Sequence, residues 1–116
     1  MELKACTLQE LTEKKKVVVI VNGRDILLVL DGKDIRAFNR VCPHARGDLV
    51  KGIMEPGHVT CINHGLKYNL ESGRINIDDL DEDIVENMDP EILEKIRLAT
   101  YTARIDGDDV ILVLSD

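Results

Sequence analysis

Short apolar runs separated by polar turns dominate the first part of the chain and predict β-strands. Residues 17–21 are all β-branched, which suits a pleated, half-buried strand. Asn22-Gly23 follows directly, and this pair is the preferred two-residue turn of a β-hairpin. Residues 26–30 are again apolar and supply the return strand. We therefore expect an antiparallel hairpin at this position.

The same combination of apolar runs and turn residues recurs along the chain. A turn is predicted at residues 8–13, and Asp31-Gly32 marks a second tight turn after the hairpin. Near the end of the chain, two apolar runs flank Asp106-Gly107 and predict a closing hairpin. Besides the two strands already named, we expect strands at residues 2–6, 35–38, 53–54, 59–60, 66–70, 74–77, 99–105 and 110–114.

Residues 78–98 depart from this pattern. Their apolar positions are three or four residues apart, which predicts an amphipathic helix or two short helices. Asp89 and Pro90 suit the cap and the first position of a new helix. We therefore expect a helical insert before the last strands. Its apolar positions are Leu80, Ile84, Val85, Met88, Ile92, Leu93 and Ile96.

Length and composition indicate one domain spanning residues 1–116. The longest apolar runs hold five residues, far fewer than the roughly 20 that cross a bilayer as a helix. No positively charged leader with an apolar segment and a cleavage site opens the chain. We therefore expect a cytoplasmic protein with no membrane partner.

Charge is distributed unevenly within a net charge of −7. Residues 1–72 carry 11 Lys or Arg against 9 Asp or Glu, whereas residues 73–116 carry 4 against 13. An acidic chain is a poor match for the phosphates of nucleic acid, so we expect no nucleic-acid partner. Its acidic end is suited to steering a basic redox partner, although such a run of charge is more often a solvated surface.

The residues that carry chemistry are concentrated in residues 42–73. Cys42 and His44 are separated by one residue, and Cys61 and His64 by two, with sixteen residues between the pairs. Each pair offers a soft thiolate and a borderline imidazole, which suits zinc, copper or an iron–sulfur cluster. In one arrangement of a 2Fe-2S cluster, two Cys hold one iron and two His hold the other.

A zinc site with two Cys and two His is an alternative that the residue types allow. Structural zinc sites, however, usually use a C-x2-4-C knuckle and an H-x3-5-H pair. No C-x2-4-C knuckle occurs in this chain. His58 belongs to neither Cys–His pair and lies beside a Pro-Gly turn. We interpret it as a surface turn residue and not as a ligand.

The segment resembles the signature of the Rieske iron–sulfur family, which is C-x-H, then C-x-x-H followed by Gly, then a hairpin that ends here at Gly73. The resemblance extends over nearly the whole chain. It implies an all-β Rieske fold of stacked antiparallel sheets, with a small cluster-binding subdomain at about residues 40–75 and the helical insert at about residues 78–98. It also implies one 2Fe-2S cluster per chain, with the ligands Cys42, His44, Cys61 and His64.

The branches of this family differ at positions that can be inspected in the chain. The high-potential, quinol-oxidising branch has an extra Cys in each ligand loop and a Ser two residues after the second ligand His. The matching positions here are Gly47, Asn63 and Leu66. The potential-tuning Tyr of that branch does have a counterpart, Tyr68. The chain is therefore similar to soluble Rieske-type ferredoxins, including the ferredoxin components of oxygenase systems and archaeal relatives.

The resemblance implies a soluble one-electron carrier, not an enzyme, which passes electrons from a ferredoxin reductase to an acceptor such as a terminal oxygenase. We expect it to be a monomer. The main alternative is a regulatory or redox-sensing iron–sulfur protein, followed by a zinc-stabilised binding module. Because two of the three Cys are assigned to the cluster, Cys6 has no disulfide partner. We expect Cys6 to be a small buried hydrophobic residue in the first strand.

Overall fold

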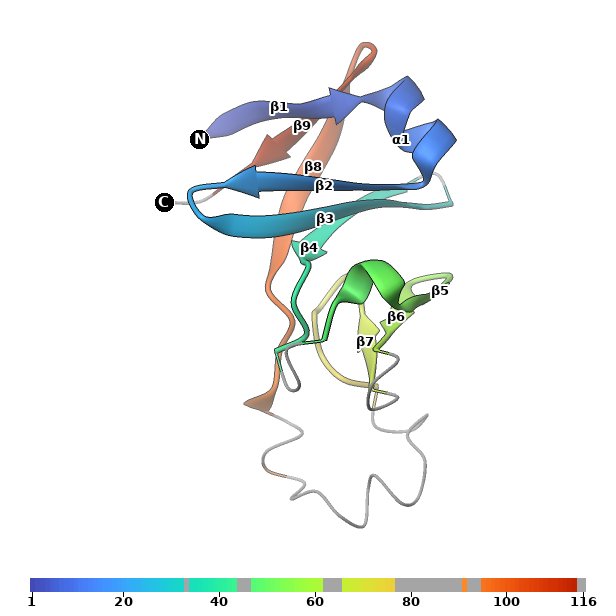
Figure 1. The fold of residues 1–116 in the computed structure, drawn as a ribbon, viewed down its shortest axis with the longest axis vertical. Coiled ribbons are helices and arrows are strands. Elements are labelled where there is room, and N and C mark those ends of the chain that lie inside the picture. Colours follow the sequence, from blue (N-terminus) through green and yellow to red (C-terminus); the bar gives the residue numbers. More distant parts are fainter. Residues whose placement is uncertain (33, 44–46, 62–65, 77–90, 92–94, 115–116) are drawn as a thin grey trace. The chain divides into compact units, whose positions relative to one another are not determined.

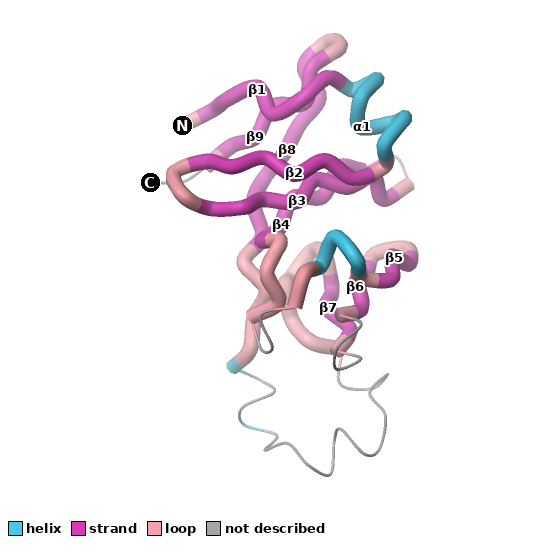
Figure 2. Tube along the Cα trace, viewed as in Figure 1, coloured by secondary structure: helices cyan, strands magenta, loops and turns pink. Residues whose placement is uncertain are grey.

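The structure is a computed structural model that describes residues 1–116 except 33, 44–46, 62–65, 77–90, 92–94 and 115–116. The chain divides into two compact units. We call residues 1–40 with 100–116 the sheet unit, and residues 41–99 the loop unit. Strands account for most of the regular structure (Figure 2). This confirms the predicted all-β class, whereas the single domain stays a prediction.

The sheet unit is built from antiparallel strands in the order β1-β9-β8-β4-β3-β2 (Figure 1). One helix, α1, follows β1. Neighbouring strands in this order are joined by hairpins or by longer connections, as expected for antiparallel sheets. The elements are β1 (Glu2–Thr7), α1 (Leu8–Lys14), β2 (Lys16–Val21), β3 (Arg24–Asp31), β4 (Asp34–Asn39), β8 (Thr100–Asp106) and β9 (Asp109–Val113).

The hairpin of β2 and β3 forms as predicted. Val21 pairs with Arg24, which leaves Asn22-Gly23 as the two-residue turn. Asn22 has φ 50° and Gly23 has φ 78°, so both turn residues adopt the left-handed conformation. Two left-handed residues are what a type I′ turn requires, and such a turn matches the twist of the strands on either side. The closing hairpin of β8 and β9 is also confirmed.

One apolar core stabilises the sheet unit. Ile26 and Leu28 on β3 pack in the same cluster as Val110 and Leu112 on β9. The two halves of the sheet, β1-β9-β8 and β4-β3-β2, therefore contribute to a shared interior, in agreement with the predicted stacking of antiparallel sheets. Cys6 belongs to this cluster and is 7% exposed, which confirms it as a small buried residue.

The segment after β1 is a correction to the sequence-based expectation of a turn at residues 8–13. It is the helix α1, Leu8–Lys14. Thr7 caps the helix because its side chain accepts a hydrogen bond from the Glu10 N–H at 3.1 Å. Leu11 is fully buried in the core of the sheet unit. The Thr-x-x-Glu pattern is typical of the start of a helix. Seven residues, however, are too few for the spacing of apolar residues to distinguish a helix from a turn.

The loop unit contains short elements joined by turns. Strands β5, β6 and β7 form a sheet in that order, and Gly57, with φ +77°, lies in the turn between β5 and β6. Of the predicted strand at residues 74–77, the described residues 74–76 include only isolated bridges, with Ile75 opposite Tyr68. The elements are the 3-10 turn η1 (Leu49–Lys51), β5 (Ile53–Glu55), β6 (His58–Thr60) and β7 (Lys67–Asn69).

Most of the helical insert predicted at residues 78–98 lies outside the described residues. Glu91 and Lys95 are helical. The end of the predicted insert is not helical, because Arg97 forms an isolated bridge with Arg74 and Leu98 follows it without helical structure. Among the helices of the described residues, none has the length and apolar character needed to cross a membrane.

Candidate metal centre

Two of the predicted ligands, Cys42 and Cys61, begin matching loops in the loop unit. The Cys42 N–H donates to the Gly47 carbonyl at 2.8 Å, and the Cys61 N–H donates to the Leu66 carbonyl at 2.9 Å. In both loops, a hydrogen bond therefore joins a cysteine to the residue five positions later. Such a bond fixes where the loop begins and ends without using the cysteine side chain.

Both cysteine side chains are buried. Cys42 is 0% exposed and Cys61 is 1% exposed, and none of the three cysteines of the chain forms a disulfide. In the sequence, His44 falls between the two ends of the first loop and His64 between those of the second, but both lie outside the described residues. The structure thus brings the two predicted thiol ligands into one unit and leaves the two predicted imidazole ligands untested.

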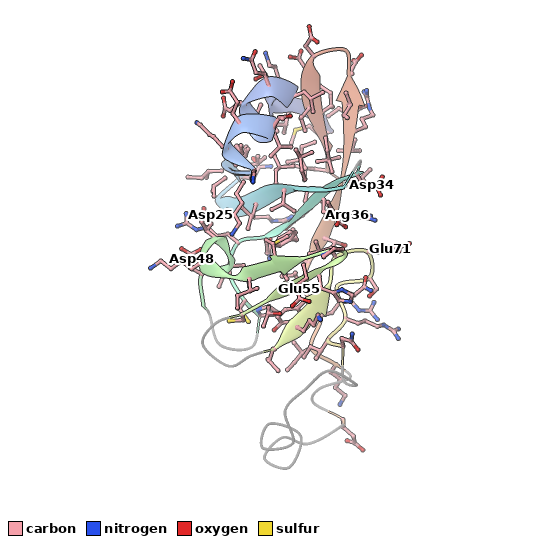
Figure 3. The ribbon with its side chains drawn as sticks, turned by 90° about the vertical axis from the view of Figure 1, so that its right-hand side faces the viewer. Asp25, Asp34, Arg36, Asp48, Glu55 and Glu71 are labelled. Atoms are coloured by element: carbon pink, nitrogen blue, oxygen red, sulfur yellow. The ribbon has the colours of Figure 1, made fainter. Side chains whose placement is uncertain are left out.

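A close approach of backbone holds the first loop against the strand that leads to the second. An Asp48 side-chain oxygen accepts a hydrogen bond from the Val50 N–H at 3.0 Å and so starts η1 (Figure 3). Gly52 follows η1, and a Cβ at this position would lie only 2.8 Å from the Thr60 carbonyl. Thr60 immediately precedes Cys61. Any larger residue at position 52 would push the chain away from this strand.

Tyr68 on β7 provides the polar contact to a cysteine sulfur. Its ring is 0% exposed, and its hydroxyl oxygen lies 3.0 Å from Cys42 Sγ. A buried tyrosine hydroxyl needs a hydrogen-bond partner, and the sulfur supplies it. Either atom can be the donor when Cys42 is a thiol. When Cys42 is a thiolate only the tyrosine can donate, and the bond then stabilises negative charge on the sulfur.

An ion pair ties the two outer strands of the small sheet together. Lys67 on β7 lies 3.2 Å from Glu55 on β5, with β6 between them (Figure 3).

His58 is the first residue of β6, not a turn residue as predicted, and its Nδ1 lies 3.1 Å from the Pro56 carbonyl. This ring nitrogen is engaged by its own turn, which agrees with its exclusion from the predicted ligands.

The donor set fits a metal centre with thiolate ligands. Two cysteines that form no disulfide are buried in one unit, each begins a hydrogen-bonded loop, and one sulfur has a hydroxyl beside it. Soft thiolates are the ligands of zinc and of iron–sulfur clusters, so these residues alone leave both open. Within the described residues, no group of three or more His, Cys, Asp or Glu side chains could hold a metal ion.

The comparison with protein families decides between these metal centres. The model of the Rieske [2Fe-2S] domain matches residues 1–87, three quarters of the chain. The chain belongs to the Rieske [2Fe-2S] domain family. Its cofactor is accordingly a 2Fe-2S cluster.

Curated relatives of this Rieske chain are much longer proteins. Apoptosis-inducing factor 3 of Mus musculus and of Homo sapiens are each 32% identical to it over 73 residues, which is 63% of this chain. The matched part is 12% of the length of each relative. The chain therefore spans about an eighth of the curated relatives that it matches.

Solved structures share the fold of this Rieske chain. The ferredoxin of carbazole 1,9a-dioxygenase from Nocardioides aromaticivorans IC177 is similar, with a TM-score of 0.75, 17% identity and 99% of both chains covered. The terminal oxygenase of the same system has a TM-score of 0.78 and 22% identity, and the match covers 99% of this chain and 30% of the oxygenase. At these identities the likeness shows the fold alone.

The sequence-based interpretation missed two features around the centre. Gly52 was not among the predicted site residues, although its missing side chain is what permits the approach to Thr60. Gly73 was assigned only to the end of a hairpin, although it contacts Leu98 directly. The spacing of residues along the chain could not reveal either contact, because each depends on how closely the backbone of a neighbouring segment approaches the glycine.

Proposed function

We propose that this protein is a one-electron carrier in which Cys42 and Cys61 bind one iron of the cluster and His44 and His64 bind the other. The observation that carries the proposal is the pair of buried cysteines at the start of two matching loops, with the Tyr68 hydroxyl 3.0 Å from one sulfur, in a chain of the Rieske family. These residues supply the thiolate side of a Rieske centre.

When bound, the 2Fe-2S cluster accepts and donates one electron, and its mixed His and Cys ligation corresponds to potentials of about −150 to +300 mV. The residues of the chain then have separate roles. The two closed loops hold the thiolates, and burial of both sulfurs keeps water from them. Tyr68 donates its hydroxyl proton in a hydrogen bond to the Cys42 sulfur, which favours the additional negative charge of the reduced state.

The proposed partners are a ferredoxin reductase as electron donor and a terminal oxygenase or another redox protein as acceptor. The similar ferredoxin is matched over its whole length, whereas the similar terminal oxygenase is matched over less than a third. This supports the role of carrier over that of catalytic component. An open hollow of about 600 Å³ on the sheet unit is lined by neither Cys42 nor Cys61. We assign no catalysis to the chain, and we place it in the cytoplasm as a monomer.

The first experiment is electron paramagnetic resonance of the dithionite-reduced protein. We expect a Rieske signal, whose average g-value lies below that of all-cysteine 2Fe-2S clusters. Two matched pairs of variants test the ligands. Cys61→Ala and His64→Ala should abolish the signal, whereas Cys6→Ala and His58→Ala should retain it. A colourless protein that contains zinc, or a Rieske signal that survives His64→Ala, would contradict the assignment.

A second experiment separates the carrier from a redox sensor. A reductive titration should consume one electron per cluster and should reverse fully on reoxidation. Sedimentation velocity should give the same sedimentation coefficient for the oxidised and reduced protein, because a carrier changes charge without changing its shape. A change in oligomeric state on reduction would argue for the sensor.

A further inference from the structure

The end of the predicted insert contacts the hairpin of the loop unit at a single glycine. The Leu98 N–H donates to the Gly73 carbonyl at 2.7 Å. A Cβ built on Gly73 would lie 2.1 Å from the Leu98 carbonyl oxygen and 3.2 Å from the carbonyl carbon. The two peptide groups are therefore closer than any residue with a side chain at position 73 would permit.

Gly73 also closes the turn that follows the strand carrying Tyr68. Its φ of +77° is a left-handed conformation that costs a residue with a Cβ more than it costs glycine. The Gly73 N–H donates to the Asn69 carbonyl at 2.7 Å. The Asn69 side-chain oxygen accepts hydrogen bonds from the Glu71 and Ser72 N–H groups at 2.8 and 3.0 Å, which shapes the rest of the turn.

After the turn, residues 74–76 form a return segment that is hydrogen-bonded to β7 on both sides of Tyr68. The Asn69 N–H donates to the Arg74 carbonyl, and the Asn76 N–H donates to the Lys67 carbonyl, each at 2.8 Å. These two hydrogen bonds lie immediately after and immediately before Tyr68, which itself faces Ile75 in an isolated bridge. On its other side Tyr68 pairs with Val59 of β6. The position of Tyr68 in the small sheet therefore depends on where the turn places this return segment.

We propose that the close contact between Gly73 and Leu98 positions Tyr68, so that its hydroxyl stays on the Cys42 sulfur and the reduction potential is kept high. Gly73 and Leu98 are positioning residues, since neither contributes an atom to the sulfur contact. The inference rests on the proposed function, because it assigns them an effect on the potential of that same centre.

The contact cannot yield easily on the side of Leu98. Its side chain is 1% exposed, so a retreat of this residue would remove apolar surface from the interior. A side chain at position 73 would therefore move the turn and, through its hydrogen bonds, the strand that carries Tyr68. Hydrogen bonds weaken with stretching and poor alignment, so a small displacement changes the contact between the Tyr68 hydroxyl and the sulfur.

The experiment is a double-mutant cycle read out as reduction potential. Redox titrations followed by electron paramagnetic resonance are run on the wild type, Tyr68→Phe, Gly73→Ala and the double variant. We expect Tyr68→Phe to lower the potential and Gly73→Ala to lower it in the same direction by no more than that. In the double variant, Gly73→Ala should add nothing to the effect of Tyr68→Phe, because the hydroxyl through which it acts is absent.

Gly57→Ala is the matched control. Gly57 has the same φ of +77° as Gly73, but nothing lies within 4 Å of a Cβ built on it. The Gly57→Ala variant therefore introduces the same backbone strain without the crowding, and we expect its reduction potential to equal that of the wild type. If Gly73→Ala leaves the potential unchanged, if it shifts the potential equally in the presence and absence of the hydroxyl, or if Gly57→Ala shifts it as much, the inference is wrong.

A further variant covers the case in which Gly73→Ala does not bind the cluster. Leu98→Ala keeps the backbone contact but loosens its packing, and the same cycle with Tyr68→Phe applies, with the same expected absence of additivity. The two levels of the argument fail differently. A wild type without a Rieske signal overturns the proposed function, whereas a normal wild type with additive shifts overturns only the role of Gly73 and Leu98.

Discussion

The sheet unit and the loop unit reach a folded state by different means. The strands of the sheet unit are five to eight residues long and enclose an aliphatic core. The strands of the loop unit hold three residues each, and its interior includes two thiols and a tyrosine hydroxyl. The first unit contains what a small β-fold needs. The second has few ladder hydrogen bonds and two buried groups suited to metal.

This difference shows how a redox centre can be built on a stable scaffold. Apolar burial and long hydrogen-bonded strands stabilise the sheet unit whether or not a metal is present. Metal binding to a site that exists only in the folded state adds directly to folding stability, and we expect this coupling in the loop unit. The two units should therefore respond in opposite ways to changes at the centre and changes in the aliphatic core.

The largest effect is expected from Cys42→Ala, which removes one proposed ligand. The protein should lose its cluster, and amide hydrogen exchange should become fast in β5, β6 and β7 while β2, β3 and β4 stay protected, because local openings follow local stability. Hydrogen exchange measured by mass spectrometry resolves the two units. Cys6→Ala is the control and should retain the cluster. Loss of protection throughout the chain would show that the sheet unit is not independent.

A change in the aliphatic core should have the opposite signature. Leu28 is fully buried, so Leu28→Ala should lower the free energy of unfolding by about 2–5 kcal/mol through lost burial and the remaining cavity. The reduction potential should stay at the value of the wild type. Urea denaturation followed by circular dichroism and a redox titration give the two values. Ile20→Thr is the control, because Ile20 is 71% exposed and threonine keeps the β-branch.

The smallest effect is expected from the ionisation of Cys6. Burial, and then the negative charge of Glu10, raise the pKa of this thiol above its ordinary value. The folded state therefore favours the neutral thiol. Its contribution to stability is complete below the pKa of the unfolded thiol, about 8.5, and is lost as the pH rises through the higher pKa of the folded state.

Urea midpoints of the wild type and of Cys6→Ala at pH 7, 9 and 10 measure this effect. The stability of the wild type should fall more steeply above pH 9 than that of the variant, since all other titrating groups are common to both. Parallel pH profiles would mean that the Cys6 thiol ionises as readily in the folded state as in the unfolded one.

Features set by neighbouring residues could be predicted from the sequence. Asn22-Gly23 determines its turn through its own backbone preferences, and the apolar runs between turn residues predicted most strands within one or two residues. The two Cys–His pairs were recognisable because ligands on one short loop must be close in sequence. The helix α1 was missed because most of its evidence is tertiary. Its capping residue Thr7 is local, whereas Leu11 is held by the core.

The amino-acid sequence by itself determined the chemistry of this protein: the thiol and imidazole residues, their spacing, the Rieske family and the antiparallel β class. Only the tertiary structure decided which groups from separate segments come into contact around these residues. It put the Tyr68 hydroxyl on the Cys42 sulfur, the Gly52 backbone beside Thr60, and the Leu98 peptide on Gly73. The physical reason is that ligand spacing and turns follow from local backbone geometry, whereas such close approaches depend on how separate segments pack.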